Sequence, residues 1–416
     1  MRNNIKQIVS NYKKVEKPIY YLILANLFIQ FISASYFVLM NYYFTKNGYQ
    51  DFEIAKVIEK RFLGVILFAF PLGLFIKGKR LKPFFYIAAF GVPTSSLLLI
   101  YAVENSLNSL VYLSVFLFGI SVIFIQTTSL PFIILNSKEE VHSESIALHF
   151  QTWVVGTIVV GLFYYTMKKI FGDSFNEKNA ILFFSIIGYI SIYFIHKIQV
   201  KENVSEKFPL KKLVSYYDWD LIIKAVLPTL FIAIGAGFTM PFISLFFEKV
   251  HGVDSATFSL TSSLTFILVF IGMGIMPTIK KKYGYKVSIL LFQSLSIVFL
   301  VLMATTEWYA HLPISAGLAL FFYVFRQPLM NVAGPMTSEL SMYFVGKKNQ
   351  ELISALNASI WSGSWFFSSR MFAILREKEI AYVNIFLITA FMYVLGVIWY
   401  NYLINQYKKN KLKTNT

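Results

Sequence analysis

The chain of 416 residues contains no cysteine, and only 14% of its residues are charged. The absence of cysteine excludes a disulfide framework and a cysteine metal site. The low charged fraction argues against a soluble protein of this length, which would also show amphipathic periods. Hydrophobic residues instead make up 56% of the chain, and the mean hydropathy is +0.60. This composition is typical of a protein that lies mostly within a membrane.

Sequence patterns of catalytic sites are missing as well. The chain has no H-E-x-x-H motif, no paired-carboxylate pattern and no P-loop. Its five histidines are scattered over different segments: His142, His149, His196, His251 and His311. These absences disfavour a membrane-embedded transferase and an ATP-driven pump. We therefore expect no enzymatic activity, no cofactor and no bound metal.

Twelve long apolar segments occupy nearly the whole chain. About 20 apolar residues in helical rise cross the ~30 Å hydrocarbon core of a bilayer, and helices satisfy their own backbone hydrogen bonds in lipid. The segments are too long for barrel strands and do not alternate in polarity. We predict an all-α polytopic membrane protein with twelve transmembrane helices. The predicted spans are 19–44, 57–76, 83–103, 108–134, 146–167, 180–196, 220–247, 257–279, 287–306, 312–336, 352–375 and 380–404.

The distribution of Lys and Arg predicts the orientation of these spans. With the N-terminus inside, the cytoplasmic segments carry 25 Lys and Arg and the outer segments carry eight. The positive-inside rule then places both termini in the cytoplasm, and we expect a monomer in the cytoplasmic (inner) membrane. The net charge of +17 invites a nucleic-acid interpretation. Its basic residues flank membrane segments, however, where topology and attraction to anionic lipid explain them.

The longest internal polar stretch divides the apolar segments six and six. It predicts an N-terminal six-helix bundle over 1–196, a cytoplasmic linker over 197–219 and a C-terminal six-helix bundle over 220–416. A local repeat relates the two halves. Ala147-Leu148-His149 precedes Trp153 at the start of the fifth segment, and Ala355-Leu356-Asn357 precedes Trp361 at the start of the eleventh. This repeat indicates a duplicated unit.

Lysine-rich loops follow the second segment of each half, at 77–82 and 280–286. Two six-helix halves, a central basic linker, cytoplasmic termini and these loops together resemble the major facilitator superfamily over essentially the whole chain. Gly73 and the cluster Lys77-Gly78-Lys79-Arg80 keep part of the family's loop signature without its acidic residue. The fifth segment lacks the Gly-Pro pair of the antiporter signature. The resemblance implies two pseudo-symmetric bundles that rock around a central path, as in a secondary transporter.

Arg326 interrupts the tenth segment about ten residues from its cytoplasmic end. An ionisable side chain at this depth costs ~2.5–3.5 kcal/mol on insertion scales, and snorkelling would not easily bring it to a headgroup layer. One interpretation is a buried pair, or a cap on backbone carbonyls freed by Pro328. The other is an anion-binding or gating arginine that faces the transport path.

Glu59 and Arg61 form a second candidate pair. Only about 15 residues lie between Phe62 and Ile76, too few to cross a bilayer, so the helix must begin near Val57 and carry both charges in its first turns. One interpretation is that they reach the outer headgroups, with Glu59 favoured at a positive helix N-terminus. The other is that a carboxylate beside an arginine couples protonation to conformation.

Two further titratable residues are candidates for gating. His149, which the repeat pairs with Asn357, either carries a proton at physiological pH or is a satisfied polar group. Glu339 follows the tenth segment and either pairs with Lys347 or Lys348 or contributes to a gate.

Uncharged polar side chains recur on segments that would line the path. Asn26 and Gln30 are four residues apart and share one helix face, as do Gln327 and Asn331. Such pairs either hold helices together or form a polar path for a hydrogen-bonding solute. The predicted substrate-binding residues are Arg326, Gln327, Asn331, Asn26, Gln30, Gln126, Gln151, Asn357 and Trp361. The predicted proton-coupling or gating residues are Glu59, Arg61, His149 and Glu339.

Two functions remain open on this fold. The first is secondary active transport of a small polar or anionic solute by alternating access, driven by a proton or another ion. The alternative is export of amphiphilic compounds or lipids, with which 43 phenylalanines are compatible. The expected partners are a small-molecule solute, membrane lipids and a coupling ion, and we expect no nucleic acid.

Overall fold

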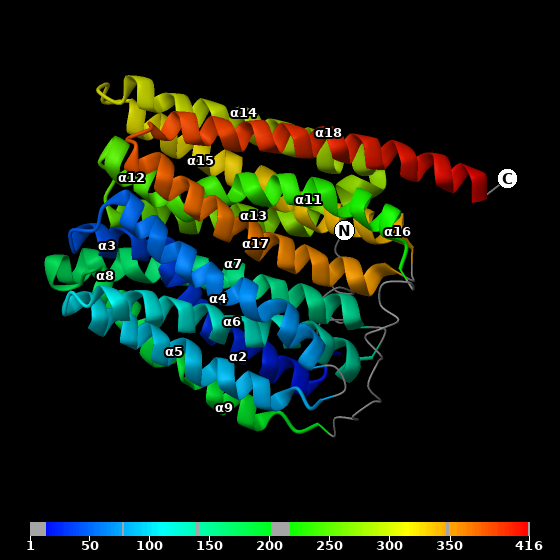
Figure 1. Cartoon of the computed structure of the whole chain (residues 1–416), viewed down its shortest axis with the longest axis horizontal. Helices are drawn as coiled ribbons and strands as arrows, with labels where there is room; N and C mark the ends of the chain where they lie inside the picture. The colour runs from blue at the N-terminus through cyan, green and yellow to red at the C-terminus, as the bar shows by residue number, and fades with distance from the viewer. Residues whose placement is uncertain (1–13, 77–78, 139–140, 201–216, 347–348, 415–416) are drawn as a thin grey trace. The chain divides into compact units, whose positions relative to one another are not determined.

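The protein is described by a computed structural model that covers residues 14–76, 79–138, 141–200, 217–346 and 349–414. Within these residues every regular element is a helix and no strand occurs (Figure 1). The prediction of an all-helical chain is therefore confirmed. Most of the predicted linker, residues 201–216, lies outside the described residues.

Contacts within the chain divide it into two compact units. The first comprises Met1–Asn47 and Lys60–Phe208, and the second comprises Gly48–Glu59 and Pro209–Thr416. The helix α4 (Asp51–Phe75) therefore begins in the second unit and continues in the first. This differs from the predicted boundaries, which assign all of 1–196 to one bundle. The reason lies in the acidic residues of the first turns of α4, which bind arginines of the second unit.

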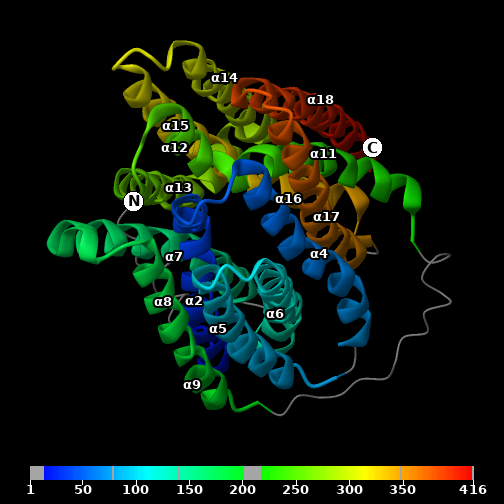
Figure 2. The ribbon, with the colours of Figure 1, turned by 60° about the vertical axis from the view of Figure 1, so that its left-hand side comes forward.

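The first unit is assembled around its first helix. Its elements are α2 (Lys17–Ser35), η1 (Tyr36–Met40), α3 (Asn41–Lys46), the later part of α4, α5 (Lys82–Glu104), α6 (Asn108–Asn136), α7 (His142–Phe171), η3 (Gly172–Ser174), α8 (Glu177–Gly188) and α9 (Ile190–Lys197). Helix α2 packs against α5, α7, α8 and α9, and α5 runs along α6 (Figure 2). Phe31 and Ala34 of α2 form a buried cluster with Val160 of α7 and Phe184 of α8.

The second unit has α11 at its centre. Its elements are the first turns of α4, α11 (Trp219–Thr239), η5 (Met240–Phe242), α12 (Ile243–His251), α13 (Ser255–Tyr285), η6 (Lys286–Leu291), α14 (Phe292–Thr305), η7 (Thr306–Tyr309), α15 (Ser315–Val332), α16 (Gly334–Val345), α17 (Gln350–Glu377) and α18 (Tyr382–Thr414). Helix α11 packs against α17 and α18, while α14 packs against α15 and α18. A Cβ atom on Gly235 would lie 2.9 Å from the ring of Tyr393, so glycine is required for the close approach of α11 and α18.

The first long helix of each unit is interrupted. In the first unit the π-helical segment Tyr36–Met40 separates α2 from α3, and in the second the 3-10 turn Met240–Phe242 separates α11 from α12. Pro241 explains the second interruption, because proline lacks an N–H and clashes with the preceding turn.

Nine helical stretches in the described residues are long and apolar enough to cross a membrane. The predicted spans 57–76, 312–336 and 352–375 are also helical but more polar, and they are not among the nine. The region 312–336 is not one continuous helix. Helix α15 ends at Val332 and a second helix, α16, begins at Gly334, because Pro335 lacks the N–H that would continue the hydrogen-bond pattern of α15.

Candidate functional site

Arg326 lies in α15 with only 1% of its surface exposed. Its Nη1 donates to the sulfur of Met240, at 2.9 Å, and to the amide oxygen of Gln327, at 2.5 Å. Its Nη2 donates to the hydroxyl of Tyr393, at 3.1 Å. Ser296 donates to the carbonyl oxygen of Arg326, which holds the backbone of this turn. The guanidinium is thus placed by residues of η5, α14, α15 and α18.

All of these partners of Arg326 are uncharged. Among the described residues no carboxylate lies within ion-pair distance of its guanidinium, and its Nε has no hydrogen-bond partner. The predicted buried pair is therefore not seen in this part of the chain. A buried ion without a counter-ion is costly, and such residues within membrane segments mark substrate or ion pathways. The arrangement leaves a positive charge that an anion would stabilise.

Met240 connects Arg326 to the interruption of the first helix of the second unit. It is the first residue of η5, directly after the end of α11 at Thr239. The sequence indicated Arg326 as a candidate site residue, but it did not indicate that Met240 and Tyr393 are its partners. Pro241 was a signal for the interruption, whereas no pattern in the sequence links Tyr393 to position 326, from which it is separated by 67 residues.

The first unit also has an arginine at its interrupted helix. Arg61 of α4 lies 4.8 Å from the ring centre of Phe118 and 5.8 Å from that of Tyr36, the first residue of η1. The rings of Tyr36 and Phe118 stack, and the Tyr36 hydroxyl donates to Ser96. A Cβ atom on Gly119 would overlap the carbonyl oxygen of Arg61, so glycine allows α6 to approach this turn of α4. Each unit therefore holds an arginine beside aromatic rings at the break in its first helix.

The predicted pairing of Glu59 with Arg61 is not formed. Residues two apart on a helix do not face each other, and Glu59 instead pairs with Arg370 of α17 at 3.4 Å. Glu59 is 4% exposed, whereas Arg370 is largely exposed. The Glu59 carboxylate therefore does lie beside an arginine, but this arginine is Arg370, which is distant in the sequence.

A second acidic residue of α4 joins the same end of α17. Asp51 accepts hydrogen bonds from Arg376 at 2.9 and 3.1 Å and from the hydroxyl of Tyr382 at 2.6 Å. The guanidinium of Arg376 also lies 4.3 Å from the ring centre of Tyr382 and donates to the carbonyl of Ile380. These bonds attach the first turns of α4 to α17 and α18.

Asp51→Asn should lower the free energy of unfolding by about 2 kcal/mol, because hydrogen bonds to charged groups contribute about 1.5–3 kcal/mol. Thermal unfolding in lipid nanodiscs measures this loss. The control is Asp173→Asn, because Asp173 forms a solvent-exposed pair with Lys168 and should contribute nothing measurable. Equal loss of stability in both variants would contradict the assigned role of Asp51.

Asn26 and His149 meet in the first unit. The amide nitrogen of Asn26 donates to the Thr152 hydroxyl at 2.7 Å and lies 3.4 Å from Nδ1 of His149. Thr152 in turn donates to the backbone carbonyl of His149. The backbone of Gln30 lies against Gly156 on the same pair of helices, α2 and α7. The sequence repeat drew attention to His149, and the structure shows that Thr152 bonds both Asn26 and the backbone of His149.

The remaining predicted residues do not gather at one point. Asn331 donates to the carbonyl of Gln327 within α15, so this pair shares a face as predicted but bonds its own helix. Gln126 is exposed, and Gln151 is half-buried. Glu339 pairs with Lys280 of α13 at 2.5 Å. Its predicted partners Lys347 and Lys348 lie outside the described residues.

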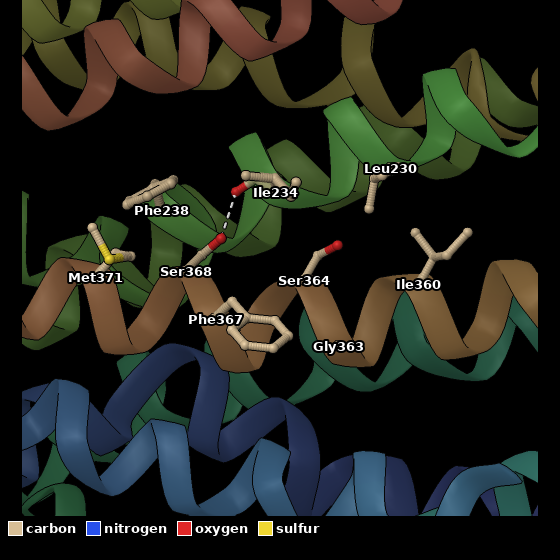
Figure 3. A pocket seen from close by; sticks show the side chains of 9 residues that line it. All are labelled: Leu230, Ile234, Phe238, Ile360, Gly363, Ser364, Phe367, Ser368 and Met371. Carbon is tan, nitrogen blue, oxygen red and sulfur yellow. Dashed lines mark hydrogen bonds between the residues drawn. The ribbon is translucent and has the colours of Figure 1, made fainter.

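A groove of about 300 Å³ lies between α11 and α17 (Figure 3). Its lining is almost wholly apolar, and no pattern in the sequence predicted this groove. The lining residues are Leu230, Ile234, Phe238, Ile360, Gly363, Ser364, Phe367, Ser368 and Met371. Trp361 and Asn357 lie on the same helix, α17. Trp361 is exposed, and the side-chain oxygen of Asn357 is buried without a hydrogen-bond partner.

Solved structures of transporters share this fold. The chain is similar to the crystal structure of a D-xylose–proton symporter, with a TM-score of 0.73 and 12% identity over 92% of this chain and 96% of that one. A bacterial homologue of the iron transporter ferroportin gives a TM-score of 0.72 at 11% identity, over 93% and 98% of the two chains. The nucleoside transporter NupG gives 0.65 at 12% identity, over 93% and 99%. No family model and no curated protein matches the sequence. The chain thus shares the fold of these solved transporters.

Proposed function

We propose that the protein is a secondary active transporter that moves a small organic anion across the cytoplasmic membrane by alternating access. The fold shared with solved transporters supports this class. In this proposal twelve helices cross the membrane as two six-helix bundles, 1–196 and 220–416, joined by the linker 197–219. Both termini lie in the cytoplasm.

The observation that carries the choice of an anion is the charge of Arg326. Its guanidinium is buried among a thioether, an amide and a phenol, and no described carboxylate neutralises it. Charge-assisted hydrogen bonds are about twice as strong as neutral ones. A carboxylate or phosphate of the solute would therefore displace these neutral partners with a gain in free energy. The interruption of the helix at Met240, which contacts Arg326, supports a solute site here, because broken helices form such sites in secondary transporters.

The proton is the proposed coupling ion, and Glu59 is the proposed acid. Its carboxylate is buried and pairs with Arg370 at 3.4 Å. Protonation of a buried carboxylate removes its attraction to a neighbouring arginine. Binding or release of a proton would thereby bias the attachment of the first turns of α4 to α17, and hence the two states of the transporter.

A screen of anionic and neutral solutes against the purified protein tests the proposal. A bound solute stabilises the native state, by about 2.7 kcal/mol when its concentration is one hundred times its dissociation constant. We expect organic anions to raise the unfolding temperature and their neutral amides or alcohols to leave it unchanged. Stabilisation by sugars or nucleosides alone would reject the anion and leave the transporter proposal standing.

Transport of amphiphilic compounds is the second candidate. The groove between α11 and α17 favours this candidate, because its lining is apolar and its volume of about 300 Å³ is that of a small ligand site. Both candidates use the same unit of the protein. A solute that carries both a negative charge and an apolar part would satisfy both observations.

A further inference from the structure

The two ends of the groove between α11 and α17 are lined by different residues. Leu230 and Ile360 lie at one end, and Phe238 and Met371 lie at the other (Figure 3). Phe238 precedes Met240 by two residues, and the sulfur of Met240 accepts a hydrogen bond from Arg326. One end of the groove therefore lies close in the chain to the residues that hold the buried charge.

Two serines of α17 point towards α11 and differ in their hydrogen bonds. The Ser368 hydroxyl donates to the carbonyl of Ile234 at 2.8 Å, which fastens the two helices (Figure 3). The Ser364 hydroxyl, one turn earlier, has no hydrogen-bond partner, although Ser364 is only 4% exposed. Some buried serines, such as Ser259 and Ser263, bond a carbonyl of their own helix, whereas others, such as Ser369 of α17, also lack a partner. Ser364 differs from Ser369 because it lines the groove. A buried hydroxyl without a partner is unfavourable, so Ser364 marks a point where a ligand would make a hydrogen bond.

We infer that the groove binds the apolar chain of a medium-chain carboxylate, and that Ser364 recognises a hydroxyl group on that chain. The inference rests on the proposed transport of an organic anion, because Arg326 supplies the charge that attracts the carboxylate. The chain lies along Leu230, Ile234 and Phe238 on one side and along α17 on the other. Its hydroxyl group bonds the otherwise unpartnered Ser364 hydroxyl.

Binding of straight-chain carboxylates from butyrate to dodecanoate tests the apolar part. The protein is held in lipid nanodiscs, and calorimetry measures each dissociation constant. Each added CH₂ should tighten binding about fourfold, or ~0.8 kcal/mol, until the groove is filled. Leu230→Trp should shorten the longest chain that still gains affinity. The control Leu295→Trp, on the exposed face of α14, should leave the series unchanged. An affinity independent of chain length would overturn the inference.

Hydroxylated carboxylates of one chain length test Ser364. At least one positional isomer should bind wild-type protein about fivefold more tightly than the unsubstituted acid, the gain typical of one net hydrogen bond. Ser364→Ala should abolish this preference while retaining the effect of chain length. Ser259→Ala is the matched control and should keep this preference, since the buried Ser259 hydroxyl bonds a carbonyl of its own helix α13 and does not line the groove. A preference that survives in Ser364→Ala would overturn the assigned role of this hydroxyl.

These measurements separate the inference from the proposed function. If Arg326→Gln leaves the affinity of every carboxylate unchanged while chain length still matters, the anion site is wrong and the groove stands. If Arg326→Gln abolishes binding but chain length has no effect, the anion site stands and the groove is wrong. Loss of co-purified bilayer lipid in Leu230→Trp, without any change in carboxylate binding, would assign the groove to a structural lipid and also overturn the inference.

Discussion

Arg326→Gln should abolish accumulation of the anionic solute, with an expected loss of about 30-fold or more in affinity. Truncation of one partner in a buried, hydrogen-bonded charge pair costs about 2–5 kcal/mol, and Arg326 is buried with only neutral protein partners. Uptake into proteoliposomes and solute binding both measure the loss. Arg326→Lys should give an intermediate defect, because lysine keeps the charge but not the planar fork of the guanidinium.

The stability of the same variant distinguishes a solute-binding arginine from a structural one. A cation without a counter-ion is a cost to the folded protein, so Arg326→Gln should unfold at the same temperature as the wild type or higher. A structural arginine would instead lower that temperature when replaced. Arg80→Gln, at an exposed arginine, is the matched control and should leave binding unchanged. Wild-type uptake by Arg326→Gln would reject the anion site.

Glu59→Gln should uncouple solute movement from the proton gradient. The glutamine resembles the protonated acid, so the pair with Arg370 is lost at every pH. With one proton per solute, a pH difference of one unit supplies ~1.4 kcal/mol and supports about tenfold accumulation. The variant should show no such accumulation but should still exchange solute down its own gradient. Proteoliposomes with an imposed pH difference, followed by counterflow of labelled solute, separate the two activities.

The control for Glu59 lies on the same pair of helices. Glu377 pairs with Lys56 of α4 at 3.7 Å, and more than half of its side chain is exposed. Because exposed pairs contribute little, Glu377→Gln should retain proton-driven accumulation. If Glu59→Gln accumulates solute as the wild type does, Glu59 is not the coupling acid and the arginine pair has only a structural role.

Several local features were predictable because they depend on residues that are close in the chain. Apolar segments predicted the helices. The predicted span 220–247 is divided into α11 and α12, because Pro241 ends the regular hydrogen-bond pattern. Proline at position 335 likewise explains why α15 and α16 separate, although the length of the apolar segment favoured one span. The shortness of the apolar segment after Phe62 predicted a helix that begins near Val57. The helix α4 instead begins at Asp51, so Glu59 and Arg61 lie in its third turn and not at its start.

The partners of the candidate site residues were not predictable in the same way. Glu59 and Arg61 are neighbours in the sequence, yet they point to different faces of α4, and Arg370 occupies the position expected for Arg61. Lys347 and Lys348 were the nearest cations to Glu339 along the chain, whereas Lys280 forms the ion pair. In both cases helix packing selected a partner that proximity in sequence did not suggest.

The sequence by itself determined that this chain is helical and membrane-embedded, because backbone hydrogen bonding and the thickness of a bilayer act on every segment separately. It also located the charge of Arg326 within an apolar segment. Only the tertiary structure decided what surrounds that charge, which carboxylate meets Arg370 and where Ser364 is left without a partner. These contacts depend on how side chains pack between helices that are distant in the chain, and no local sequence pattern predicts that packing.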